Sequence, residues 1–510
     1  MSKLNSDLIE RFEAFSNYSK PSLAYNAFFK WGAMAVNIAT VFLLTPFVIS
    51  QIGKYGYGIW ALLTSMVGYY GLLNLGITSA VSRFVSLNLG KKDLPALSVT
   101  FNTAFFAFFI TGLLAIFLAY TIGPILAGAF SVEDEAQFVA LIKVMGIAVA
   151  LGFPTSVLIS LLIAHESYRA QSAIAIISSL LKTACTVYLL LNGHGLMGVA
   201  YAFLIAAVFN FVAYLVLVLS NFPWVQVSWS DARLDMLKKM VKFGIPTLIM
   251  TVGGLLRTKL DTIVIGSMLS IEQVAVYSIA ALIITQVFSI ANSGLGVVTP
   301  RFARLHGAGK DLRPLFFSGL FFGSVLAFSA GVGVFLFGEH FIQLWLGDGF
   351  AEAIPVLWIL MFCYIITIIQ IPGFTVLLAL NKHSIFAAIN ICEGIANVIL
   401  SVLLAPKFGL VGVAMGTAIP MLVVKTIVQP YLVSRAVGVS LKEYIKPTLI
   451  PALYGILFVG ITFYLQLNQN INDLNWLYFV LIAIGVMGTL FALIISSAKL
   501  IKPELLKLNY

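Results

Sequence analysis

The sequence GLLNLGITSAVSRFVSLNLGKKDLPAL at residues 71–97 returns in altered form as SIANSGLGVVTPRFARLHGAGKDLRPL at residues 289–315. The two stretches align without gaps at an offset of 218, and nine of their 27 positions are identical. The same offset pairs Pro154 with Pro372, and GLMGVA at 195–200 recurs, with a four-residue slip, as GLVGVA at 409–414. The chain therefore contains an internal duplication, and its two halves, near 20–220 and 240–435, are related in sequence.

The composition is typical of a membrane protein. Of the 510 residues, 60% are hydrophobic and 10% are charged, whereas a soluble domain has about 45–50% apolar and 25% charged residues. The apolar residues fall in blocks of roughly 20, the length at which a helix crosses a bilayer. The three cysteines are isolated and the five histidines are scattered. We therefore expect no disulfide, no metal site and no cofactor.

Hydropathy predicts an all-α integral membrane protein with fourteen transmembrane helices. An N-terminal lobe at 1–220 holds spans 1–6, a cytoplasmic linker covers 221–242, a C-terminal lobe at 243–435 holds spans 7–12, and 436–510 holds spans 13–14 with a cytoplasmic tail. The expected spans lie near 24–49, 56–80, 97–120, 138–163, 172–191, 197–219, 243–267, 274–298, 316–337, 354–380, 384–405, 410–433, 446–466 and 475–497. Because six is even, the lobes are two pseudo-symmetric bundles in the same orientation, an arrangement suited to alternating access around a central cavity.

The basic residues support this count. If the N-terminus is cytoplasmic and every span changes side, the cytoplasmic segments hold 23 of the 30 Lys and Arg, the outer loops hold two, and five lie inside spans. Such a bias is the positive-inside rule, and it predicts that both termini are cytoplasmic. The net charge of +10 therefore reflects membrane topology and does not indicate a nucleic-acid partner.

Residues 55–86, YGYGIWALLTSMVGYYGLLNLGITSAVSRFVS, followed by KKD at 91–93, resemble the second span of polysaccharide flippases. These proteins belong to the multidrug/oligosaccharidyl-lipid/polysaccharide exporter superfamily, and the 6+6+2 plan is similar to that of its fourteen-span members. The resemblance implies a V-shaped, two-lobed transporter in the bacterial cytoplasmic (inner) membrane. Its activity would be to move an undecaprenyl-diphosphate-linked oligosaccharide from the cytoplasmic to the outer leaflet, for O-antigen, capsule or exopolysaccharide synthesis.

The partners expected from this resemblance are the lipid-linked oligosaccharide, membrane lipid, a coupling proton or sodium ion, and a polysaccharide polymerase with its chain-length machinery. We expect the protein to be a monomer. The sequence does not identify the glycan or the coupling ion.

Charged residues inside spans are the first candidates for transport, because an ionisable side chain at bilayer depth costs a few kcal/mol. Five cations (Lys143, Lys182, Arg257, Lys259 and Lys425) stand against two anions (Asp261 and Glu393). This excess favours an anionic substrate such as a diphosphate. Lys182 and Lys425 lie too deep to reach the interface easily and are predicted to bind substrate, whereas Lys143, near the outer end of its span, is expected to snorkel.

Span 7 carries both signs of charge. Arg257 and Asp261 are four residues apart on one helical face, which predicts an internal ion pair that either orients the helix or forms a substrate or ion site. Asp261 and Glu393 are the only acidic residues inside the expected spans. They are therefore the candidates for binding a coupling proton or sodium ion.

Lys30 lies early in span 1, on one stripe with Asn26, Asn37 and Thr40. A polar stripe on an apolar span is expected to face protein or a water-filled cavity, which makes Lys30 a candidate substrate ligand. The alternative is that Lys30 snorkels to the inner interface and that the asparagines join helices.

The duplicated residues are candidates as well. Arg83 and Arg301 lie at the inner ends of spans 2 and 8, where each would meet a lipid diphosphate entering from the cytoplasmic leaflet; the alternative is topological anchoring on anionic headgroups. Asn74 and Asn292 are candidates for bonding sugar hydroxyls, although interhelical hydrogen bonds are the simpler interpretation.

Three other functions compete with this one. A drug or cation antiporter of the same superfamily is disfavoured by the cationic interior. A peptidoglycan-precursor flippase has the same architecture and stays open. A membrane polysaccharide polymerase would need a long outer loop with catalytic residues, and the sequence has no such loop. It also has no phosphate-binding GxxxxGK[ST] motif, so we expect no ATPase within the chain. We therefore expect a transporter and not an enzyme.

Overall fold

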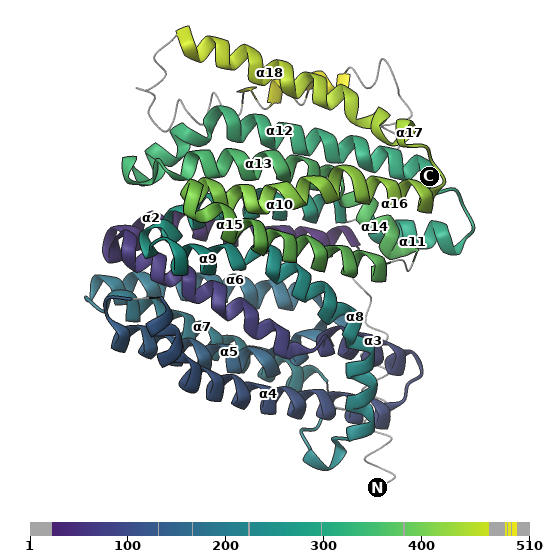
Figure 1. The fold of residues 1–510 in the computed structure, drawn as a ribbon. Helices are drawn as coiled ribbons and strands as arrows, with labels where there is room; N and C mark the ends of the chain where they lie inside the picture. Colours follow the sequence, from purple (N-terminus) through teal and green to yellow (C-terminus); the bar gives the residue numbers. More distant parts are fainter. Residues whose placement is uncertain are drawn as a thin grey trace. The chain divides into compact units, whose positions relative to one another are not determined.

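The computed structural model describes residues 23–130, 132–165, 167–222, 225–296, 298–380 and 383–468, together with the short pieces 485–486, 488–490 and 492–496. Within these ranges the chain is helical and contains no strand. Nine helices of the described chain are long and apolar enough to cross a membrane. The protein is therefore an all-α, multi-pass membrane protein, as the composition predicts (Figure 1).

The chain divides into two compact units, Met1–Val252 and Gly253–Tyr510. The helices of the first unit are α2 (Leu23–Tyr70), α3 (Ile77–Gly90), α4 (Leu94–Ala129), α5 (Glu135–Ala164), α6 (Tyr168–Leu191), α7 (Gly195–Asn221) and the first part of α8 (Leu234–Thr258). The division thus falls inside α8, and residues 221–242, expected as a linker, belong to the first unit.

Up to residue 468, the described part of the second unit contains the end of α8 and ten further helices. These are α9 (Leu260–Met268), α10 (Ile271–Gly296), α11 (Thr299–Gly307), α12 (Arg313–Leu346), α13 (Ala353–Ile369), α14 (Ile371–Ala379), α15 (His383–Val423), α16 (Gln429–Val437), α17 (Leu441–Ile445) and α18 (Leu449–Asn468). A π-helical turn, Val424–Val428, joins α15 to α16.

The nine long apolar helices are fewer than the expected spans partly because two of them bend at a glycine, and each of these two contains two expected spans. Gly53 in α2 has φ 71° and Gly409 in α15 has φ 57°, in the left-handed region that favours glycine. Each bend separates two expected spans: 1 from 2 in α2, and 11 from 12 in α15. The first thirteen expected spans coincide with helical segments. The fourteenth, near 475–497, lies mostly outside the described residues, so the count of fourteen stays a prediction.

The duplicated stretch forms a broken helix in both copies. In the first copy, α2 gives way to a 3-10 turn at Gly71–Asn74 and then to α3; in the second, α10 is followed by the short helix α11. In both copies a long helix comes next, α4 or α12. The two breaks differ in position, since Gly76 has φ 70° whereas its counterpart Gly294 lies within α10.

Two contacts relate the loops of the first unit to opposite ends of its helices. The Tyr55 hydroxyl oxygen accepts a 2.8 Å hydrogen bond from the backbone N–H of Glu133, which joins the α2 bend to the α4–α5 turn. At the other end, Ser98 donates a 2.8 Å hydrogen bond to Asp231. Which of the two ends is cytoplasmic stays a prediction.

The segment that follows α7 is fastened to α4. The buried amide of Asn102 donates to the carbonyl of Gln226 and accepts from the N–H of Ser228, both at 2.8 Å. Thr103 accepts from the N–H of Arg233 at 3.0 Å, and the Trp229 ring lies 4.6 Å from that of Phe106. Residues 226–233 therefore follow a fixed course along α4.

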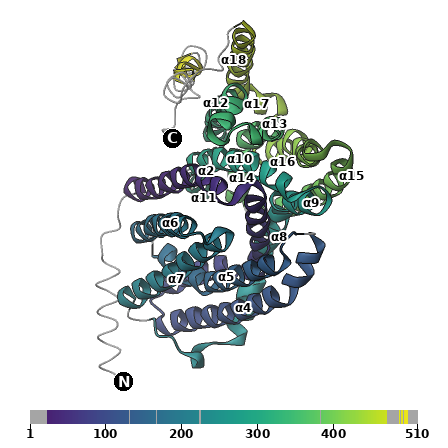
Figure 2. The ribbon, with the colours of Figure 1, turned by 90° about the vertical axis from the view of Figure 1, so that its left-hand side faces the viewer.

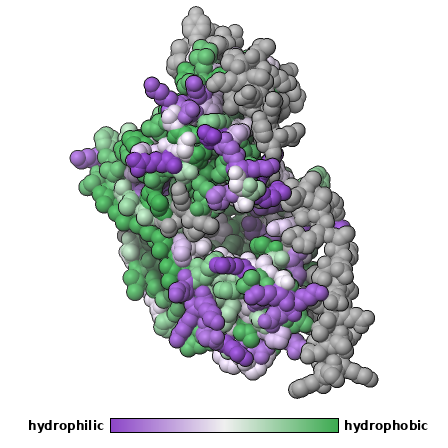
Figure 3. All heavy atoms as spheres, turned by 90° about the vertical axis from the view of Figure 1, so that its right-hand side faces the viewer, coloured by the Kyte–Doolittle hydropathy of each residue, from purple (hydrophilic) through white to green (hydrophobic). Residues whose placement is uncertain are grey.

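Apolar side chains complete both units. In the first, Phe101, Phe105, Phe108 and Phe153 pack in a buried cluster contributed by α3, α4, α5 and α7. In the second, Phe321 and Val325 of α12 pack against Leu490 and Ile494, and α18 also packs against α12. Figure 3, which faces one end of the helices, shows hydrophilic side chains gathered at that end and hydrophobic ones along the flank, the distribution expected across a membrane boundary.

Candidate functional site

A carboxylate between two cations lies in the second unit. Arg257 Nη1 is 3.3 Å from Glu393 Oε1, and Lys425 Nζ is 3.7 Å from Glu393 Oε2. The side chains of Glu393 and Lys425 are 1% and 5% exposed, and that of Arg257 is 20% exposed. The Lys425 ammonium also lies 5.1 Å from the centre of the Phe386 ring. Two positive charges against one negative charge leave this cluster with a net charge of +1.

Close contact between α8 and α15 brings the cluster together. A Cβ added at Gly253 would lie 2.8 Å from the backbone carbon of Asn390, and one added at Gly394 would lie 2.7 Å from Leu256 Cβ. Small residues at such a contact let two membrane helices approach closely. Arg257, one turn beyond Gly253, then reaches Glu393. Lys425 arrives from the π-helical turn, a distortion that is frequent at functional sites.

The expected Arg257–Asp261 pair is wrong. α8 ends at Thr258 and α9 begins at Leu260, and Lys259 between them has φ −118° and ψ −19°. This break turns Asp261 away from the face that the four-residue spacing of a continuous helix predicts. Arg257 pairs with Glu393 instead, 136 residues further along the chain.

Asp261 occupies a separate buried site. Its side chain is nearly inaccessible, with the residue 4% exposed, and its Oδ2 accepts hydrogen bonds from Tyr277 at 2.6 Å and from Thr417 at 2.7 Å. Asn397 in turn donates to Thr417 at 2.8 Å. Among the described residues, Asp261 Oδ1 and Asn397 Oδ1 have no hydrogen-bond donor. Two buried oxygens thus keep capacity for a proton or a cation.

None of the three neighbours of Asp261 was singled out from the sequence. Tyr277 lies on α10, Asn397 on α15 and Thr417 on the second part of α15, beyond the bend at Gly409. Asn397 follows Glu393 by one helical turn, so a polar stripe on span 11 was the available signal. The contribution of Tyr277 and Thr417 depends on tertiary packing.

A cavity of about 530 Å³ lies inside the first unit. Helices α2, α5, α6 and α7 surround it, and Figure 2 shows α5, α6 and α7 next to one another in a view along the bundle. Its lining includes two of the predicted site residues, Asn74 and Lys182. The cavity lies within the range of about 300–1,000 Å³ that small-molecule sites occupy.

The predicted polar stripe of span 1 faces this cavity in part. Asn37 lines the cavity, and Thr40 exchanges a 3.0 Å hydrogen bond with Ser179 of α6. Lys30 is exposed on α2 and no contact joins it to the cavity lining. The side chain of Asn26 lies outside the described residues.

The duplicated residues have unlike surroundings. Asn74 bonds locally to Thr78, accepting from its N–H at 3.2 Å, and so caps the start of α3. Arg83 places its guanidinium 4.4 Å from the centre of the Phe243 ring, while its copy Arg301 lies on α11. Asn292 is exposed on α10. None of these four residues belongs to the Glu393 cluster or the Asp261 site.

The described chain contains no group of three or more His, Cys, Asp or Glu that would hold a metal ion. The oxygens at Asp261 and Asn397 suit a single, weakly bound monovalent cation better than a resident metal, because only one of the two carries a charge.

Comparison with known proteins identifies the family. The model of the family described as "Polysaccharide biosynthesis protein" matches residues 52–355. The chain is 22% identical over 439 residues to "Uncharacterized membrane protein EpsK" of Bacillus subtilis (strain 168), covering 80% of this chain and 83% of that one. It is 18% identical over 392 residues to "Putative O-antigen transporter" of Shigella flexneri, covering 76% and 93%.

The fold also matches solved structures. The lipid II flippase MurJ in its inward closed conformation superposes with a TM-score of 0.74 over 93% of this chain and 99% of that chain, at 13% identity. At this identity the likeness concerns the fold. The family match over residues 52–355, more than half of the chain, decides the assignment: this protein belongs to the polysaccharide biosynthesis protein family.

Proposed function

We propose that this protein is a flippase that moves an undecaprenyl-diphosphate-linked oligosaccharide from the cytoplasmic to the outer leaflet of the bacterial cytoplasmic membrane by alternating access. The observation that carries the proposal is the cluster at Glu393, in which Arg257 and Lys425 share one carboxylate. A buried charge of +1 is unfavourable in a bilayer unless an anion offsets it. A lipid diphosphate provides that anion.

Arg257 is the member best placed to contact the substrate. Its side chain is 20% exposed, against 5% for Lys425, and its Nε has no hydrogen-bond acceptor among the described residues. A guanidinium with a free edge binds phosphate through two parallel hydrogen bonds. Lys425 then supplies charge at the second oxygen of the carboxylate, and Lys30 and Lys182 stay predicted substrate ligands of the first unit.

Ion coupling is assigned to Asp261 in this proposal. Glu393 already has two cationic partners, so binding a further cation there would be opposed by like charges. Asp261 has only neutral donors at Oδ2 and a free Oδ1. A proton or a sodium ion at Asp261 would therefore restore neutrality during the return of the empty transporter.

The rival functions have weaker support. Binding of a cationic drug calls for a carboxylate facing the cavity, and the lining of the first-unit cavity contains no Asp or Glu. A peptidoglycan-precursor flippase shares both the diphosphate and the fold, so it differs from the proposal only in the glycan. The substrate's diphosphate is thus the testable common element.

The test measures surface polysaccharide in cells that produce the protein as their only flippase, with its membrane abundance measured in parallel. Arg257→Ala makes the cluster neutral and should reduce export at least tenfold. Arg257→Ala combined with Glu393→Gln returns the cluster to +1 through Lys425, and should recover export in part if charge alone matters, whereas Arg257→Lys tests the need for a guanidinium fork. Lys143→Ala is the control, because Lys143 contacts the Tyr120 ring outside the cluster. Unchanged export in Arg257→Ala and Lys425→Met would refute the diphosphate assignment.

A further inference from the structure

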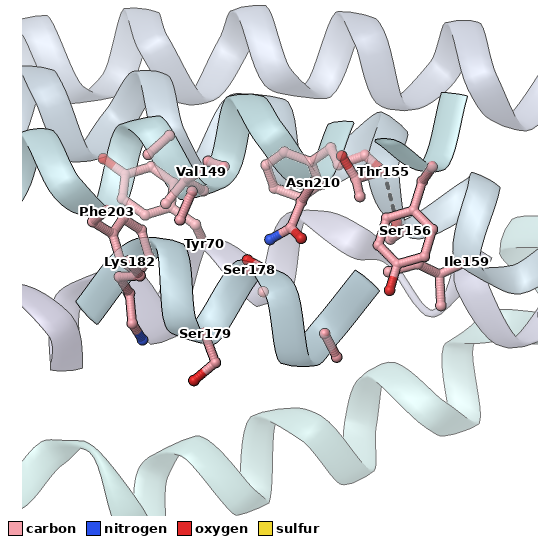
Figure 4. A pocket seen from close by; sticks show the side chains of 18 of the residues that line it. Tyr70, Val149, Thr155, Ser156, Ile159, Ser178, Ser179, Lys182, Phe203 and Asn210 are labelled. Carbon is pink, nitrogen blue, oxygen red and sulfur yellow. Dashed lines mark hydrogen bonds between the residues drawn. The ribbon is translucent and has the colours of Figure 1, made fainter. Parts of the chain in front are cut away.

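The cavity of the first unit is a chemically distinct site. Asn210 of α7 and Ser178 of α6 point toward one another across it, with Phe203 and Lys182 at one end (Figure 4). The Tyr214 and Tyr70 rings add aromatic surface to its wall. The site thus combines amide and hydroxyl groups with flat apolar faces.

Small residues create this space. Ala148 and Gly152 on α5, Ala175 on α6, and Ala206 and Ala207 on α7 all line the cavity. Helices packed through larger side chains would fill it. A Cβ added at Gly152 would meet no atom within 4 Å, so the cavity extends directly from that position.

The polar groups of the wall keep unused hydrogen-bonding capacity. In the described part of the chain, the side chains of Asn37, Ser178 and Asn210 have no hydrogen-bond partner. Each amide offers two donors and one acceptor oxygen, and the hydroxyl offers both roles. Groups of this kind are expected to find partners at bilayer depth, because leaving them unpaired costs free energy. Here a ligand or water must supply those partners.

The charge of the lining restricts the ligand further. Lys182 is the one charged residue of the lining, and no acidic residue of the described chain forms an ion pair with it. The site therefore favours a neutral or anionic ligand and disfavours a cation.

We propose that this cavity binds one sugar ring of the transported glycan, and that Lys182 favours a ring carrying a negatively charged substituent. A pyranose presents hydroxyls at its edge to the free amides and hydroxyl, and a C–H face to Phe203 or Tyr214. The inference rests on the proposed flippase function, because it is the glycan of the same substrate that would enter. It adds a recognition site in the first unit to the diphosphate cluster of the second.

The test uses the full-length protein in lipid nanodiscs and three free sugars as probes: glucose, N-acetylglucosamine and glucuronate. Saturation-transfer NMR should detect binding of at least one sugar at millimolar concentration, with glucuronate preferred. Lys182→Gln should remove most of that preference, about tenfold in affinity for glucuronate, while leaving glucose binding nearly unchanged.

A steric variant separates the cavity from nonspecific binding. Gly152→Leu places a side chain into the open space and should abolish the binding of all three sugars. Gly128→Leu is its matched control, because Gly128 is a helical glycine on α4 with equally open surroundings that does not line the cavity. Equal binding by these two variants, or no binding of any sugar to the unmodified protein, would overturn the inference.

The two proposals fail in different ways. Arg257→Ala should leave sugar binding intact, because Arg257 does not line this cavity. One possible result is that Arg257→Ala abolishes export but the unmodified protein binds no free sugar. That result would support the proposed flippase function and refute the sugar site in the first-unit cavity. Sugar binding in a protein whose export ignores Arg257 would support the site and refute the diphosphate cluster.

Discussion

Asp261 and Glu393 are the two acidic residues that the described part of the chain buries, and their carboxylates have opposite surroundings. Glu393 lies between two cations, whereas Asp261 accepts hydrogen bonds from two neutral hydroxyls. The two residues that the sequence proposes for one role are therefore suited to different ones. Glu393 holds two positive charges, whereas Asp261 keeps one carboxylate oxygen, Oδ1, without a donor among the described residues.

Removing the Glu393 charge should destabilise the protein. Glu393→Gln leaves two buried cations without a counter-ion, a change that typically costs about 3–5 kcal/mol. The melting temperature of the purified protein in detergent should fall clearly. Adding Lys425→Met to Glu393→Gln removes one of the two cations and should recover most of the loss. If the double variant melts lower than Glu393→Gln, the cluster is not held by charge balance.

Neutralising Asp261 should uncouple transport from the ion gradient. In Asp261→Asn, which keeps the size of the side chain, export should be lost or should no longer respond to ionophores that collapse the proton or sodium gradient. Thr417→Val removes one donor and should weaken coupling less. The exposed Asp348→Asn serves as the control. Export by Asp261→Asn that stays fully sensitive to the same ionophore would exclude Asp261 as the coupling residue.

Topology can be tested with two cysteines. In a variant with Cys185, Cys363 and Cys392 replaced by serine, a cysteine at exposed position 348 should react with an impermeant reagent added to intact cells. A cysteine at position 238, also exposed, should react only after the membrane is opened. The reverse labelling pattern would contradict the fourteen-span model with cytoplasmic termini.

Two glycines with positive φ should respond differently to alanine. Gly53 has φ 71° and ψ 175°, and Gly76 has φ 70° and ψ 8°, so alanine at either position costs about 1–3 kcal/mol of backbone strain. At Gly76 the added Cβ would also lie 2.2 Å from the Gly244 carbonyl oxygen, whereas at Gly53 it meets nothing within 4 Å. Gly76→Ala should therefore melt at a distinctly lower temperature than Gly53→Ala. Equal melting temperatures would mean that the contact at Gly244 relaxes freely.

Hydropathy and duplication predict the helices well because each bilayer crossing demands a long apolar segment and each half repeats the other's pattern. They predict side-chain partners poorly. The spacing of Arg257 and Asp261 assumes an unbroken helix, and neither proline nor glycine marks the break at Lys259. Glu393, the true partner of Arg257, comes from another helix, and no rule of local spacing connects them.

The cavity of the first unit was predictable in part. Lys182 and the stripe from Asn37 to Thr40 point to it, and Ser178 and Ser179 lie one turn before Lys182 on span 5. Asn210 and Phe203 line the cavity only because α7 packs against α5 and α6. A lining assembled from four helices depends on the packing of all four, which no single segment encodes.

The fastening of residues 226–233 to α4 sets a limit on changes of chain length. A solvent-exposed loop without tertiary contacts accepts inserted residues at little cost in folding free energy. In this segment, however, a single amide of Asn102 holds two backbone groups that are two residues apart, so one inserted residue would put the second group out of register. Epitope tags and fused reporter domains are therefore better placed at the exposed turn around Gly193, between α6 and α7, than in the polar stretch that looks like the natural joint of the chain.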